Sequence, residues 1–267
     1  MKIDIQDIYS GNFKFDNVPE DSIAICGAAI RTERWIDIYN FFKSTNECNF
    51  IIIFCGHVVP DFTLPENFYF IQSSELPAAC GEICLRVAKK IPEVKYLLSV
   101  PDDCYFSEHA LDTLLKEFES HEGQFIEIGM GFWGDLDANE QSALPLLFHN
   151  DNLDSQRLTM CGMRTKQTCN KIGSIDKSFK GQYWDVDRTM RLISMGGKIK
   201  TLDHVRITEM PSKNGSHLLG PRFFTHDRGY LDYLWSAGNN RCNKFRKVAV
   251  ESYEDKDLTG VLHLNEQ

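Results

Sequence analysis

Short apolar runs alternate with amphipathic segments through the first half of the chain. Three of these runs predict buried strands, over 22–27, 49–54 and 68–72. A helix is expected to begin at Gly81 and to run to about Lys90. A fourth buried strand is expected over 96–100, where Pro101 ends it because proline has no N–H for a sheet ladder. The alternation predicts an α/β fold with a mostly parallel sheet and helices on both faces.

Helical spacing of apolar residues appears twice more along the chain. The first of these helices presents one apolar face, formed by Leu111, Leu114, Leu115 and Phe118, and Ser107 precedes it as a good N-cap. In the second, apolar residues follow at i, i+4 and i+7, as Val186, Met190 and Ile193. Glycines at 196 and 197 end it, since glycine supplies the backbone freedom that a helix C-terminus favours. A strand over 198–202 and a last helix over 223–235 are expected to follow.

Two acidic side chains stand at the start of the second of these helices. Asp185 and Asp187 fall in or just before its first turn, where unpaired N–H groups and the helix dipole stabilise negative charge. A carboxylate that is held ionised there can act as a base. The alternative is that Asp185 only caps the helix and Asp187 faces solvent, because aspartate is a common capping residue.

A second acidic pair, Asp102 and Asp103, follows the strand that Pro101 ends. Ligands of open α/β sheets bind outside the carboxyl ends of the strands, so this pair stands where a ligand is expected. Adjacent carboxylates repel each other. A hard cation such as Mg2+ or Mn2+, held by one or two carboxylates and a substrate's phosphates, would relieve that repulsion. The alternative is a solvated turn.

Together, the two acidic segments resemble the GT-A glycosyltransferases, especially the inverting group that includes the family 2 enzymes. Residues 100–107 resemble the metal-binding acidic motif of that group, and residues 173–192 resemble its Gly-x-x-Asp-x-x-Phe…Glu-Asp-x-Asp helix. Residues 158–164 are similar to the strand that precedes this helix. The resemblance extends from about Ile23 to Trp235 and implies a Rossmann-like GT-A fold.

The same resemblance implies the domain organisation. A single catalytic domain is expected over 1–245. Its nucleotide-sugar-binding half would be 20–106 and its acceptor-binding half 107–245. Residues 246–267 would form a C-terminal tail.

Metal ligands carry over by position. Asp103 matches the metal-coordinating acid of the motif, and Asp102 matches its neighbour, which lies near the ribose or the ion. A third ligand, often histidine, is expected after the strand over 198–202. Position points near Thr208 or Glu209, whereas chemistry points to His217, which we prefer.

For catalysis, the resemblance matches Asp185 to the base that takes a proton from the acceptor hydroxyl, while Asp187 is expected to be structural. Trp184 stands where the family often has glutamate. Trp133 and Trp184 would either stack against an acceptor sugar or belong to the core.

Five further residues are expected near the nucleotide sugar, namely Ala28, Arg31, Ser74, Glu75 and Gly81. Ala28 and Arg31 follow the first strand, where many relatives carry Thr and Asn. The guanidinium of Arg31 would approach the diphosphate, although a solvent-facing loop arginine is the alternative. Ser74 and Glu75 follow the third strand and are otherwise simple loop residues. Gly81 would let the donor approach closely, or it is only a helix-start glycine.

Composition limits the partners. The formal net charge of −9 argues against a non-specific nucleic-acid binder, which needs clustered Lys and Arg. The basic run over 241–247 would contact an anionic lipid surface or an acidic acceptor, or would be a solvated tail. No apolar run approaches the roughly 20 residues that span a bilayer. Nine cysteines without a paired C-x-x-C motif argue for free thiols in a reducing compartment, so a cytoplasmic protein is expected.

The combined expectation is a metal-dependent glycosyltransferase that uses Mn2+ or Mg2+ and a nucleotide-diphosphate sugar, with a UDP-sugar as first choice. It would transfer the sugar with inversion to a hydroxyl of a glycan or similar acceptor. Two other functions stay open. A sugar-phosphate nucleotidyltransferase would need a better phosphate loop than residues 26–31 provide, and a catalytically silent glycan-binding protein would share the fold. Retaining chemistry also stays open, since spacing does not fix stereochemistry.

Overall fold

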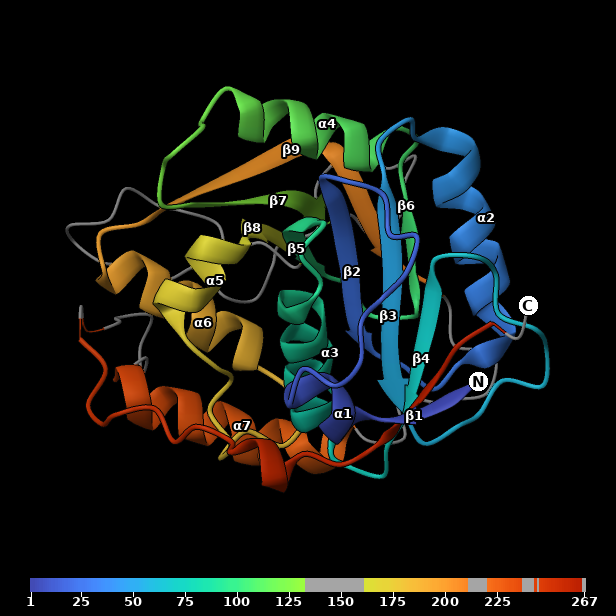
Figure 1. The fold of residues 1–267 in the computed structure, drawn as a ribbon. Helices are drawn as coiled ribbons and strands as arrows, with labels where there is room; N and C mark the ends of the chain where they lie inside the picture. Colours follow the sequence, from blue (N-terminus) through green and yellow to red (C-terminus); the bar gives the residue numbers. More distant parts are fainter. Residues whose placement is uncertain (133–160, 211–219, 237–242, 244, 266–267) are drawn as a thin grey trace.

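The computed structural model describes residues 1–132, 161–210, 220–236, 243 and 245–265 (Figure 1). Within them, one mixed sheet runs through the molecule in the order β1-β10-β4-β3-β2-β5-β8-β7-β9-β6. The strands are β1 (Lys2–Asp4), β2 (Ser22–Ala28), β3 (Phe50–Gly56), β4 (Phe68–Gln72), β5 (Val94–Ser99), β6 (Cys104–Phe106), β7 (Ile126–Phe132), β8 (Gly162–Thr165), β9 (Lys198–Glu209) and β10 (Val261–His263).

The centre of the sheet is parallel, as the sequence predicts. β4, β3, β2 and β5 run in the same direction, with Ile25 of β2 paired to Ile52 of β3 and to Leu98 of β5. The second half is mixed: β8 lies antiparallel between β5 and β7, whereas β7 and β9 are parallel. The carboxyl ends of the four central strands therefore meet at one edge of the sheet.

Helices cover both faces of this sheet. They are α1 (Ile5–Tyr9), α2 (Trp35–Thr45), α3 (Pro77–Lys90), α4 (Ala110–Glu119), α5 (Lys166–Ile172), α6 (Trp184–Ser194) and α7 (Gly220–Trp235), with short 3-10 turns at Thr32–Arg34 and Asp255–Asp257. Figure 1 shows α2 and α3 on opposite sides of the central strands.

Two cores result from the alternation of side chains along the strands. Successive residues of a strand point to opposite faces, so Ile23 and Ile25 pack with α2 and α4, while Ala24 and Cys26 pack with α3 and α6. Trp35 at the start of α2 is fully buried against Phe54 and other aromatic rings of the first core. The expectation of helices on both faces is thus confirmed.

Several local boundaries differ from the sequence predictions, and two of the differences change the interpretation of a named residue. α3 begins at Pro77, so Gly81 lies inside the helix rather than opening it. α4 begins at Ala110 with His109 in the left-handed region, and Ser107 does not cap it. The Ser107 hydroxyl instead accepts a hydrogen bond from the Arg206 N–H of β9 at 3.0 Å, because residues 104–106 form a strand beside β9.

The C-terminal segment is part of the domain and not a separate tail. β10 pairs antiparallel with β4 on one side and with β1 on the other, with Leu262 fully buried between Ile71 and Ile3. Arg246, expected in a basic surface strip or a solvated tail, instead lies in a buried ion-pair cluster. β10 covers the edge of β4, whose backbone groups would otherwise be left unpaired.

No helix of the described chain is long and apolar enough to cross a membrane.

Candidate active site

Asp102 lies at the carboxyl end of β5, where it is fully buried and binds the loop that follows β2. Its Oδ2 accepts hydrogen bonds from the N–H groups of Ile30 and Arg31 at 2.7 and 2.6 Å, and from Trp35 Nε1 at 3.2 Å. Its Oδ1 accepts from Arg31 Nη1 at 2.7 Å. Both oxygens accept from protein donors, so Asp102 positions the loop after β2, and its expected place near the ribose or the metal stays a prediction.

Arg31 joins the two acids of this pair. Its Nη1 contacts Asp102 Oδ1 at 2.7 Å, and its Nη2 contacts Asp103 Oδ2 at 2.9 Å. Burial alone would lower the pKa of the Arg31 guanidinium, but the charges of Asp103 and Asp102 outweigh it and raise the pKa, so the cation persists. The Arg31 side chain is only 17% exposed, and the alternative of a solvent-facing loop arginine is wrong.

Asp103 is the member of the pair that stays accessible. Its side chain is 14% exposed, against 1% for Asp102. Its carboxylate thus stands at the carboxyl edge of the sheet with part of its surface open to a ligand.

Asp185 lies in the first turn of α6, as the sequence predicts. Burial raises the pKa of its carboxyl, opposed by hydrogen bonds from the N–H groups of Val186 and of Asp185 itself and by the charge of Arg164. The residue as a whole is half-buried. A carboxylate with a raised pKa at the start of a helix has the properties expected of a base.

Beneath Asp185 lies a buried ion pair that the sequence did not reveal. Arg164 of β8 donates to Glu127 of β7 through Nε at 2.9 Å and Nη2 at 2.6 Å. Thr189, one helical turn after Asp185, donates to Glu127 Oε2 at 3.0 Å and accepts from Arg164 Nη2 at 3.0 Å. A lone Glu and a lone Arg in apolar strands were the available signal, since buried charges are normally paired.

The charges of the two candidate acids both affect one buried thiol. Cys161 immediately precedes β8, which runs antiparallel to β5, so the start of β8 lies beside the end of β5. Burial raises the pKa of Cys161, and the charges of Asp185 and Asp103 raise it further. Asp103 and Asp185, 82 positions apart in sequence, therefore both raise the pKa of a thiol at the carboxyl edge of the sheet.

The chemistry of this site fits a divalent cation that a diphosphate helps to hold. No group of three or more His, Cys, Asp or Glu side chains among the described residues could bind a metal alone. Mg2+ at phosphate sites commonly uses one or two carboxylates with phosphate oxygens and water, and Asp103 supplies one such carboxylate. His217, the preferred third ligand, lies outside the described residues.

Asp187 is structural, as expected, and does not face solvent. It is fully buried, and its Oδ1 accepts from Trp235 Nε1 at 2.9 Å and from Arg246 Nε at 3.0 Å. Arg246 also pairs with the buried carboxylate of Asp176. The first turn of α6 is thus tied to α7 and to the C-terminal segment.

Another buried acid holds the turn that leads into α6. Asp227 of α7 accepts hydrogen bonds from the N–H groups of Lys180, Gly181 and Gln182, the last two at 2.8 Å. These N–H groups belong to the segment just before Tyr183, which has a left-handed backbone at the start of α6. The fold therefore fixes the approach to Asp185 from α7.

Trp184 and Gly81 form one packing contact. A β-carbon on Gly81 would lie 3.1 Å from Cζ2 of Trp184 and 3.4 Å from Cδ1 of Ile175. The missing side chain of Gly81 therefore makes room for the indole of Trp184, which packs on the second core. Trp133 lies outside the described residues.

The other nucleotide-site candidates are only partly brought together. Ala28 ends β2, two residues before the loop that Asp102 holds. Ser74 is exposed after β4, and Glu75 turns toward the C-terminal segment, where its Oε1 accepts from Thr259 Oγ1 at 3.4 Å. The carboxyl ends of β4 and β2 lie at the same edge of the sheet, with β3 between them.

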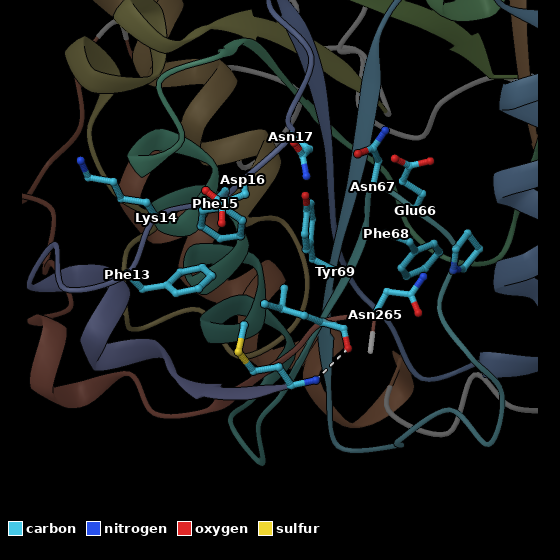
Figure 2. A pocket seen from close by; sticks show the side chains of 13 residues that line it. Phe13, Lys14, Phe15, Asp16, Asn17, Glu66, Asn67, Phe68, Tyr69 and Asn265 are labelled. Atoms are coloured by element: carbon cyan, nitrogen blue, oxygen red, sulfur yellow. Dashed lines mark hydrogen bonds between the residues drawn. The ribbon is translucent and has the colours of Figure 1, made fainter. Parts of the chain in front are cut away.

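A cavity of about 840 Å³ lies elsewhere, at the amino end of β4 (Figure 2). Phe15 packs edge-on against Phe13 and Tyr69 in its wall, with ring centroids 5.1 and 5.2 Å apart. None of the site residues predicted from the sequence lines it. Because the central strands are parallel, this cavity and the acids lie at opposite edges of the sheet.

Comparison with known proteins identifies the fold. The crystal structure of S. aureus TarS matches with a TM-score of 0.53 and 13% identity, over 80% of this chain and 40% of that chain. TarS 1–349 matches with a TM-score of 0.50 and 14% identity, over 72% of this chain and 60% of that chain. TarS is a GT-A family 2 glycosyltransferase, so this chain has the GT-A fold that its motifs predict.

This chain spans less than two thirds of the length of either TarS structure. No protein-family model and no curated protein sequence matches it.

Proposed function

We propose that the protein is a metal-dependent glycosyltransferase that transfers a sugar from a nucleotide-diphosphate sugar to an acceptor hydroxyl with inversion. The observation that carries the proposal is the placement of Asp103 after the carboxyl end of β5 and of Asp185 in the first turn of α6 of a GT-A fold, with both charges raising the pKa of the buried thiol of Cys161. Ligands of open α/β sheets bind at this edge.

Asp185 would act as the base. Its carboxylate would accept the proton of the acceptor hydroxyl while the oxygen forms a bond to the anomeric carbon. The bond from that carbon to the diphosphate oxygen breaks, and the leaving nucleoside diphosphate keeps the electron pair. The raised pKa of Asp185 favours its capture of a proton at neutral pH.

Asp103 would hold Mn2+ or Mg2+ together with the diphosphate of the donor. The bound cation would neutralise charge that develops on the leaving group. Asp102 would keep the loop after β2 in place, so that Arg31 stays beside the diphosphate site. UDP is the first nucleotide to test, because TarS has been crystallised in complex with UDP.

Two substitutions separate the roles of the acids. In thermal-shift and calorimetric titrations with UDP-, GDP- and TDP-sugars, Asp103→Asn should weaken binding that depends on Mn2+ about tenfold or more. Asp185→Asn should leave that binding unchanged and reduce transfer or slow donor hydrolysis about 100-fold or more, the usual range for a general base. Asp37→Asn, which alters an exposed acid of α2, is the matched control.

Two results would count against the proposal. If Asp185→Asn still transfers sugar at the rate of the intact protein, Asp185 is not the base. A protein that neither binds nor hydrolyses any of these donors with Mn2+ would be a silent protein on the GT-A fold.

A further inference from the structure

Arg31 occupies the carboxylate that the proposed metal needs. Its Nη2 lies 2.9 Å from Asp103 Oδ2 and its Nη1 lies 2.7 Å from Asp102 Oδ1. A guanidinium and a divalent cation bear charge of the same sign and compete for one carboxylate. In the protein without donor, metal binding at Asp103 must therefore displace Arg31 or act against its charge.

The two ends of this bridge are not equivalent. Asp102 has three further donors, the N–H groups of Ile30 and Arg31 and the indole N–H of Trp35. All three donate to Oδ2 and would keep that oxygen hydrogen-bonded after the Arg31 side chain has moved, whereas Oδ1 would lose the hydrogen bond from Arg31 Nη1. Asp103, by contrast, is partly exposed and lies where ligand is expected. The guanidinium can thus leave the pair while Asp102 keeps three of its four hydrogen-bond donors.

A diphosphate offers Arg31 a better partner. Arginine binds phosphate oxygens through two parallel N–H bonds, and the planar fork suits phosphate as well as carboxylate. The Arg31 side chain is 17% exposed and stands next to the proposed diphosphate site, so it can exchange one anion for the other.

We propose that Arg31 couples donor binding to metal binding. Without a diphosphate, it holds Asp103 and lowers the affinity of that carboxylate for Mn2+. When a nucleoside diphosphate binds, the guanidinium moves to the phosphate oxygens and releases Asp103 for the metal. Metal and nucleotide then strengthen each other's binding by the same factor, as linkage requires. This inference rests on the proposed function of the site.

Mn2+ titrations test the coupling without an activity assay. Free Mn2+ is measured by electron paramagnetic resonance with and without UDP, for the intact protein, for Arg31→Gln and for Arg86→Gln. In the intact protein, UDP should tighten Mn2+ binding at least about fivefold, within the usual range of coupling between sites. Arg31→Gln should bind Mn2+ more tightly than the intact protein in the absence of UDP, and UDP should then tighten it by a smaller factor.

Arg86→Gln is a close control. Arg86 also bridges a buried and a more exposed acid, Glu82 and Asp255, and its side chain is 15% exposed. It lies on α3 and has no role in the proposed site, so its replacement should leave the Mn2+ affinity unchanged, both with and without UDP.

The outcomes are distinct. If UDP tightens Mn2+ binding by the same factor in the intact protein and in Arg31→Gln, the coupling role of Arg31 is refuted, while the proposed metal site is not. The same holds if Arg31→Gln binds Mn2+ more weakly without UDP. If neither variant nor the intact protein binds Mn2+ with or without UDP, the proposed metal-dependent function fails as well.

Discussion

A carboxylate that must accept a proton works only while it is ionised. At Asp185, burial raises the pKa, whereas the N–H groups of the first turn of α6 and the charge of Arg164 oppose the rise. Glu127, which pairs with Arg164, acts in the same direction as burial. The buried ion pair under α6 therefore affects the pKa of Asp185 through two nearby charges of opposite sign, whose effects partly cancel.

The pH profile of transfer should report this balance. A base is active above its pKa, so kcat/KM should fall as the pH decreases through the raised pKa of Asp185. Arg164→Met removes a charge that lowers this pKa, and the acid limb of the profile should move to higher pH. The double variant Arg164→Met, Glu127→Gln leaves no unpaired buried charge and should shift the limb less, in the same direction. An acid limb that stays in place or moves to lower pH in both variants would refute the assignment of Asp185.

At the scale of elements, the start of α6 is set by packing against α3. Gly81 lies in the middle of α3, a position that costs helix stability, and its open space is filled by the indole of Trp184. An alanine at position 81 would therefore suit α3 as a helix, but its β-carbon would crowd Trp184 at the start of α6.

Gly81→Ala should lower the free energy of unfolding of the intact protein but raise that of the Trp184→Phe variant. In the intact protein, the new β-carbon would lie 3.1 Å from Trp184 Cζ2, and overpacking of about 1–3 kcal/mol should exceed a helix gain of about 1 kcal/mol. In Trp184→Phe the crowding atoms are gone, and Gly81→Ala should raise the free energy of unfolding by about 1 kcal/mol. Urea unfolding of the four proteins measures both values.

Gly229→Ala is the control for this cycle. Gly229 lies in α7, and a β-carbon added there would have no neighbouring atom within 4 Å, so its replacement should stabilise both backgrounds alike. If the changes in free energy of unfolding caused by Gly81→Ala and Trp184→Phe simply add in the double variant, the two helices do not constrain each other.

At the scale of the whole molecule, the C-terminal segment closes the structure. β10 lies between β4 and β1, Gln6 Nε2 donates to the Leu258 carbonyl at 2.8 Å, and Arg246 joins Asp176 to Asp187. Residues near both ends of the chain thus support both the side of the sheet next to β4 and the first turn of α6.

Leu262→Ala should destabilise the entire domain. Leu262 is fully buried in the core that also contains α3 and α6, and truncation of a buried leucine costs about 2–5 kcal/mol. The loss should appear as a shift of one cooperative unfolding transition. Val261→Ala, at a half-buried position of the same strand, should cost less than the buried truncation. Equal, small effects of both variants would support the separate tail expected from the sequence.

Much of the framework follows from local pattern. β4 occupies the range that its apolar run predicts, and α6 begins beside Asp185 and ends before Gly196, whose φ of +83° suits glycine. The GT-A resemblance rests on the same segments, and the solved TarS structures agree with it. These features depend on residues close in sequence, because periodicity and helix termini are set by neighbours.

The chain by itself therefore determined the parallel core, the start of α6 and the choice of Asp103 and Asp185 as candidate acids. Only the tertiary structure decided that Asp102 faces inward to hold the loop of Arg31, and that Arg246 reaches Asp187 across 59 residues. A lone charged residue in a sequence does not reveal its counter-ion. That partner is fixed by the path of the chain, since a buried charge is stable only where the fold brings an opposite charge to it.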